Sequence, residues 1–188
     1  QKEVFEIRKA GLNILMSMKG DKKPVAFIED CAVSLDHLAE YTARLKEIFK
    51  KYNTSGMFYA HASVGTLHIR PVLNMKSDKD IKNMRSISQE AFEMVKDYKG
   101  SHSGEHGDGI VRSEFHEMMF GKKIINAFEE IKDTFDSKNL LNPGKIVRPL
   151  KSNDRSLMRY KSGYQTQDIS THYDLSLIHI SEPTRLGF

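Results

Sequence analysis

The sequence predicts an α+β fold of the ferredoxin-like kind, an antiparallel sheet with helices on one side, followed by a C-terminal helical segment. Two observations support this prediction. Between residues 24 and 99, the apolar spacing indicates the order strand, helix, strand, strand and helix. The chain has 188 residues, of which 39% are hydrophobic and 29% charged, which is enough apolar content for one domain with a buried core.

The individual elements follow from local patterns. Apolar residues at helical spacing predict the helices, Ser34 and Ser77 are typical N-caps, and Pro24 can begin a strand. The stripe of methionines is interpreted as core packing. In chain order, we predict a helix over 1–18, a strand over 24–29, a helix over 34–51, two strands over 57–74, a helix over 77–99, a short helix capped by Ser113, a helix over 122–136 whose apolar side (Ile124, Ile125, Phe128, Ile131, Phe135) faces inward, and a last short strand at 146–147.

The two strands over 57–74 place histidines close together. If they meet in a two-residue turn at Val64 and Gly65, His61 lies opposite His68. Because side chains alternate across a strand, one face then carries Tyr59, His61, His68 and Arg70, and the other carries small and apolar residues. Opposed residues are close enough for two imidazoles to share one metal ion. Val-Gly is not a preferred hairpin turn, so other registers stay open.

A glycine-rich stretch over 100–109 predicts a loop of fixed conformation that carries candidate functional residues. It contains four glycines, which allow positive φ and close approach to a ligand. Glu105 can ligate a metal, and His106 can move a proton near neutral pH. His102 is interpreted as a loop residue without a ligand role. The competing interpretation of the whole stretch is a flexible connector.

Composition narrows the function classes. The single Cys31 excludes a disulfide framework or a Cys-ligated cluster within this chain and fits a reducing compartment. The net charge of +4 comes from scattered residues, so we expect no nucleic-acid partner. We see no transmembrane segment and no signal peptide, and the missing initiator Met suggests that this is not the natural start. We expect residues 151–174 to be a linker and 175–188 to be an adaptor-derived artefact tail.

Three motifs resemble one known family. Residues 60–68 are similar to its Gly-His-x-Gly-Asp-Gly-Asn-x-His, 103–107 match its Ser-Gly-Glu-His-Gly, and 142–145 match its Asn-Pro-Gly-Lys. The family is the C-terminal domain of FAD-linked oxidases of the vanillyl-alcohol-oxidase type, which includes D-lactate and D-2-hydroxyglutarate dehydrogenases and the glycolate oxidase flavin subunit. The resemblance covers most of residues 1–150, which we expect to form that domain, partial at its N-terminus.

The resemblance implies the oxidation of a D-2-hydroxy acid to the 2-oxo acid, with hydride transfer to FAD. It implies that FAD is bound mainly by an upstream domain, that a quinone or cytochrome accepts the electrons, and that [4Fe-4S] clusters can lie in a downstream half. It places the protein in the cytoplasm, with a peripheral position at the inner membrane face left open. The implied roles are His61, His68 and Glu105 as ligands of a divalent metal (Zn²⁺ or Mn²⁺), His106 as catalytic base, Arg8 and Arg70 as substrate-binding residues, and Asn142 and Lys145 as flavin contacts.

Two alternatives stay open on the residues alone. One is a metal-dependent hydrolase in which Glu105 or His106 activates water, although the chain has no His-Glu-x-x-His helix. The other is a non-catalytic binding domain in which His61 and His68 have only a structural role.

Overall fold

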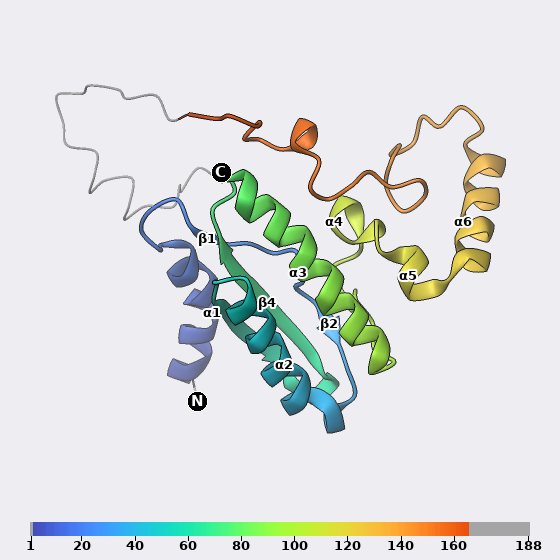
Figure 1. The fold of residues 1–188 in the computed structure, drawn as a ribbon. Helices are drawn as coiled ribbons and strands as arrows, with labels where there is room; N and C mark the ends of the chain where they lie inside the picture. Colours follow the sequence, from blue (N-terminus) through green and yellow to red (C-terminus); the bar gives the residue numbers. More distant parts are fainter. Residues whose placement is uncertain (1, 166–188) are drawn as a thin grey trace.

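The computed structural model describes residues 2–165, without the side chains of Arg8 and Leu12 (Figure 1). The predicted artefact tail and the end of the predicted linker lie outside these residues. The elements are α1 (Lys2–Met16), β1 (Lys23–Pro24), β2 (Cys31–Ala32), α2 (Leu38–Lys51), β3 (Gly56–His61), β4 (Thr66–Leu73), α3 (Asp78–Asp97), α4 (Gly109–Ser113), α5 (His116–Phe120) and α6 (Lys122–Phe135), with single 3₁₀ turns at Leu35–His37, Ala62–Val64 and Arg155–Leu157.

The sheet is antiparallel, and β4 is its central strand. Leu67 on β4 pairs with Cys31 on one side and with Ala60 on the other. β1 pairs with the far end of β4, through Leu73 and Val72. Helices α2 and α3 lie together over one face of the sheet (Figure 1). The predicted α+β class is therefore confirmed. The core between these layers contains Tyr41, Leu45, Phe49, Leu67, Ile69, Ile87, Ala91, Phe92 and Val95, all of them 5% exposed or less.

The predicted strand over 24–29 is wrong in its extent. Only Lys23–Pro24 and Cys31–Ala32 join the ladder, and the segment between them leaves it. Phe27, Ile28 and Asp30 are all buried, so the side chains do not alternate between a solvent-exposed face and a buried face, as they would in a regular strand at the surface. Asp30 also has a φ of 80°, which a continuous strand does not accommodate.

The hairpin has a different register from the one predicted with a two-residue turn. His61 pairs with Thr66, and His68 pairs with Tyr59. Residues 62–65 form a longer connection that ends at Gly65, which has a φ of 71°. A Cβ at Gly65 would overlap the carbonyl oxygen of Val33, so glycine is required there. The register moved by two positions, which is an even number, so the predicted face with Tyr59, His61, His68 and Arg70 is retained.

Several cap and strand predictions change near the ends of elements. Ser77 caps α3 as predicted, by accepting a hydrogen bond from the amide of Asp80. Ser34 makes no side-chain cap bond, and a 3₁₀ turn separates it from α2. Ser113 is the last residue of α4 and does not cap a helix. Residues 146–147 form no strand, and Ile146 has a φ of 63°.

The apolar side of α6 is not buried as predicted. Ile131 and Phe135 are 58% and 83% exposed, and no residue of this helix is fully buried within the described chain. Helix α6 reaches away from the sheet (Figure 1), and within the described residues its apolar side meets Phe120 of α5 and the loop after the helix, which leave it partly exposed. Val4, Phe5 and Ile7 on α1 are likewise exposed. None of the described helices has both the length and the apolar character needed to cross a membrane.

Candidate metal centre and catalytic loop

The glycine-rich loop connects α3 to α4 and returns to the sheet. Ser101 and Ala32 exchange two backbone hydrogen bonds, at 2.8 and 2.9 Å, which fasten the start of the loop to β2. A Cβ at Gly100 would overlap the carbonyl oxygen of Ala32, so this close approach requires glycine. The prediction of a shaped loop, as opposed to a flexible connector, agrees with this contact.

Asp30 holds the middle of the loop. Its Oδ2 accepts hydrogen bonds from the backbone amides of Gly104, Glu105 and His106, at 2.8, 2.7 and 2.8 Å. The amide of Gly104 also donates to the carbonyl of Asp30 at 2.9 Å. Hydrogen bonds to an ionised carboxylate are stronger than neutral ones. The backbone that carries Glu105 and His106 is therefore set by a single buried acid.

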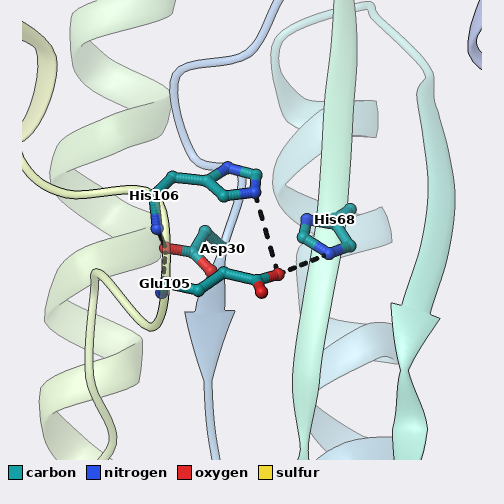
Figure 2. A group of neighbouring side chains, drawn as sticks. All are labelled: Asp30, His68, Glu105 and His106. Atoms are coloured by element: carbon teal, nitrogen blue, oxygen red, sulfur yellow. Dashed lines mark hydrogen bonds and ion pairs between the residues drawn. The ribbon is translucent and has the colours of Figure 1, made fainter.

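The side chains of this loop contact the face of the sheet that carries His61 and His68 (Figure 2 shows His68). Oε1 of Glu105 lies 3.0 Å from Nε2 of His68 and 3.3 Å from Nε2 of His61. The two imidazole centroids are 5.0 Å apart. Nε2 of His106 lies 3.7 Å from the same carboxylate oxygen, and its ring stacks on His68. The structure thus brings His61, His68, Glu105 and His106 together, although the paired positions of the hairpin are not those expected.

Behind His68 lies a second carboxylate, which is buried. Glu29 is 2% exposed, and its Oε1 lies 3.5 Å from Nδ1 of His68. The hydroxyl of Tyr59 donates to Glu29 at 3.1 Å, and Nη2 of Arg70 lies 3.0 Å from both of its carboxylate oxygens. The contact between Glu29 and Nδ1 of His68 is not a hydrogen bond, and Nε2 is the ring nitrogen that faces Glu105.

The electrostatics favour a neutral His68. Burial lowers the pKa of His68, and the neighbouring His106 and His61 lower it further, against the opposing influence of Glu29 and Glu105. The neutral imidazole is the form that binds a metal. Cys31 is not a candidate ligand, because burial raises the pKa of its thiol to about 12.

The other predicted site residues lie in different places. Arg70 is on the same face as His68, but it is paired with Glu29, and its side chain is 16% exposed. Arg8 lies on α1, and its side chain is outside the described part of the structure. Asn142 and Lys145 line a groove of about 510 Å³ together with Gly109 and apolar residues of α6. The substrate and flavin roles of these four residues stay predictions.

Sequence reasoning missed Glu29 and Asp30. Both come at the end of an apolar run, and two adjacent acids in such a place are a signal that could have been noticed, because buried carboxylates are rare without partners. The hydrogen-bond partners of these carboxylates lie 30 to 76 positions away along the chain, between Tyr59 and His106. Asp30 also lies close enough to His68, Glu105 and His106 to offer a further metal ligand.

Comparison with known proteins identifies the fold and its motifs. Residues 1–146 match the model of "FAD linked oxidases, C-terminal domain". A D-2-hydroxyglutarate dehydrogenase of Haemophilus influenzae is 35% identical over 80% of this chain and 15% of its own length. The glycolate oxidase subunit GlcD of Bacillus subtilis is 30% identical over 75% of the chain and 29% of its own length.

A third relative is a mitochondrial D-lactate dehydrogenase [cytochrome] of Arabidopsis thaliana, which is 28% identical over 79% of the chain and 26% of its own length. The chain therefore spans less than a third of each of these relatives. The match of the family model to most of the chain, together with these similarities, shows that the chain belongs to the family of the C-terminal domains of FAD-linked oxidases.

Proposed function

We propose that this domain supplies the metal ligands and the catalytic base of an FAD-dependent dehydrogenase that oxidises a D-2-hydroxy acid. The observation that carries the proposal is the convergence of His61 and His68 on one oxygen of Glu105, with His106 beside them. Family membership favours this chemistry over a metal-dependent hydrolase and over a domain with structural histidines only.

The residues fit a divalent metal such as Zn²⁺ or Mn²⁺. Two imidazole nitrogens lie within 3.3 Å of one carboxylate oxygen, which is close to the separation of two ligands on one ion with bonds of about 2.1 Å. Three protein ligands leave coordination positions for a substrate. The metal, when bound, supplies a positive charge that lowers the pKa of the substrate hydroxyl. Glu29 lies 3.5 Å from Nδ1 of His68, and Nε2 of the same ring faces Glu105.

His106 is placed to accept a proton. Its side chain is 43% exposed, so it is accessible, and Asp30 fixes its backbone amide. We assign Nε2 of His106 as the atom that takes the proton of the α-hydroxyl, while the α-hydrogen leaves with its electron pair as hydride. FAD, when bound, is the hydride acceptor.

A cavity of about 570 Å³ borders the metal ligands. Ala32, His61, Ser63, Thr66 and Glu105 are among its lining residues. Its size suits a small 2-hydroxy acid of the D-lactate, glycolate or D-2-hydroxyglutarate class. Arg8 and Arg70 are the proposed partners of the substrate carboxylate, because a planar guanidinium binds a carboxylate at two points.

The remaining parts of the reaction lie mainly outside this chain. The groove beside Asn142 and Lys145 is largely apolar and fits contact with one part of a flavin, so we propose that most of the FAD site belongs to another domain. A quinone or cytochrome as electron acceptor, [4Fe-4S] clusters in a longer parent protein and a cytoplasmic, membrane-peripheral location are proposals of the same kind.

His106→Ala tests the proposal in the longer protein that carries this domain. Loss of a general base typically lowers kcat about 10²–10⁴-fold. We expect that loss in flavin reduction by the hydroxy acid, with metal content unchanged, whereas His61→Ala and His68→Ala should lose metal and activity together. His37→Ala is the matched control, since His37 is exposed and stacks on Tyr98 away from the site. Wild-type flavin reduction by the His106→Ala variant would refute the assignment of the base.

A further inference from the structure

A second cluster of metal-ligating side chains lies on the other side of the glycine-rich loop. His102 follows α3, Asp108 directly precedes α4, and His116 begins α5. We propose that His102, Asp108 and His116 bind a second divalent transition-metal ion, separate from the ion at His61, His68 and Glu105, and that this ion fastens the catalytic loop to α5. The proposal departs from the interpretation of His102 as a loop residue without a ligand role.

The three side chains point at a common space. Nε2 of His116 lies 3.2 Å from Oδ2 of Asp108, and Nε2 of His102 lies 3.8 Å from Oδ1 of the same carboxylate. The two rings are 5.4 Å apart and nearly perpendicular, at 89°. One ligand atom from each residue lies within 4.8 Å of the others. Ligands around one ion are a little more than 3 Å apart when each bond is about 2.1 Å, so small side-chain movements complete the site.

Burial makes the cluster costly unless something occupies it. His102 and His116 are 1% and 2% exposed. Within the described residues, both ring nitrogens of His102, both of His116 and Oδ1 of Asp108 are buried without a hydrogen-bond partner. Each such unsatisfied group costs about 1–3 kcal/mol. A metal ion would bind one nitrogen of each ring and the carboxylate, which removes the largest part of this cost.

The surroundings favour a metal over a buried ion pair. Phe92, which is fully buried, and Phe120 pack their rings edge-on against His102, so the environment of this imidazole is largely apolar. The nearby guanidinium of Arg112 donates to the carbonyls of Glu29 and Gly107, and none of its hydrogen bonds within the described residues goes to the Asp108 carboxylate.

The donor set indicates the class of metal. Two imidazoles and one carboxylate suit Zn²⁺, Mn²⁺, Fe²⁺ or Co²⁺, whereas Ca²⁺ and Mg²⁺ prefer oxygen ligands throughout. The role we assign is structural. His102 and Asp108 flank Glu105 and His106 on one loop, so an ion bound between the flanks and His116 limits the movement of the loop that serves the first site.

Metal counting on this chain tests the inference. Apo-protein is titrated with Zn²⁺ by calorimetry, and the same protein loaded with ¹¹³Cd²⁺ is examined by NMR. We expect two equivalents and two resonances. Asp108→Asn and His116→Gln should each remove one equivalent and one resonance, and His61→Ala should remove the other. His37→Ala is the control and should retain both.

The outcomes separate this site from the first one. A single equivalent that is lost in Asp108→Asn and kept in His61→Ala would support the second site and count against the metal of the proposed function. A single equivalent that is lost in His61→Ala and kept in Asp108→Asn would overturn the second site. If circular dichroism shows that Asp108→Asn and His116→Gln do not fold, His61→Ala still decides: one retained equivalent and one resonance support the second site, and loss of all bound metal refutes it.

Discussion

Asp30 is the residue whose replacement should most clearly uncouple the loop from the sheet. Its Oδ2 accepts three backbone hydrogen bonds, at 2.7–2.8 Å, and Asp30 is fully buried. A hydrogen bond to a charged group contributes about 1.5–3 kcal/mol, and bonds that share one oxygen are less than additive, so Asp30→Ala should lower the free energy of unfolding by about 3–5 kcal/mol. That is a large part of the about 5–15 kcal/mol that stabilises a typical domain.

The backbone at Asp30 provides a matched set of variants. Because its φ is 80°, alanine there adds about 1 kcal/mol of strain that glycine avoids, whereas both remove the carboxylate. The expected order of stability is therefore wild type, Asp30→Asn, Asp30→Gly and Asp30→Ala. Urea denaturation followed by circular dichroism measures the order, and Zn²⁺ titration should show weaker binding in the same order. A wild-type urea midpoint for Asp30→Ala would refute the reasoning.

Three further predictions follow from other contacts. Gly65→Ala should lower the free energy of unfolding by about 3 kcal/mol or more, because the new Cβ overlaps the backbone carbonyl of Val33. Gly20→Ala is the control: Gly20 also has a positive φ, of 84°, but no atom lies within 4 Å of the new Cβ, so only backbone strain is added. Equal urea midpoints for the two variants would contradict this. Burial lowers the pKa of His102 from 6.5 to about 4, so as the pH falls the unfolded state takes up the proton before the folded state does. The metal-free chain should therefore lose about 3 kcal/mol of its free energy of unfolding between pH 6.5 and pH 4. If His102→Leu shows the same dependence of stability on pH as the wild type, His102 is not the cause. Arg70→Met should destabilise the chain by about 3–5 kcal/mol, because it leaves the Glu29 carboxylate buried without its ion pair. A wild-type urea midpoint for this variant would contradict the structural part of the role of Arg70, whatever its effect on KM.

The sequence alone was sufficient for features that depend on neighbouring residues. Side chains alternate along a strand, so the common face of His68 and Arg70 was predictable from their positions, and His61 shares it in any register that differs by an even number of positions. Helical spacing and the Ser77 cap are also local, and they predicted α3 and its start. The motif at 103–107, through its resemblance to a family, indicated Glu105 as a candidate metal ligand and His106 as a candidate base.

Only the tertiary structure decided features that depend on distant parts of the chain. The hairpin register follows from residues 62–65 and from Val33, which leaves room only for glycine at position 65. The apolar sides of α1 and α6 were predictable, but which element covers them is not a local property.

Dependence on distant parts of the chain also explains why several residues around the site could not be predicted. Asp30 and Glu29 are important because the fold brings them to backbone amides and side chains far along the chain, and a single sequence does not show such pairings. His102 and His116 are polar residues that a sequence places at the surface by default, and packing against Phe92 and Phe120 buries them beside Asp108. Secondary structure and strand faces depend on neighbouring residues, whereas the burial of a side chain and the meeting of distant site residues depend on the fold of the whole chain.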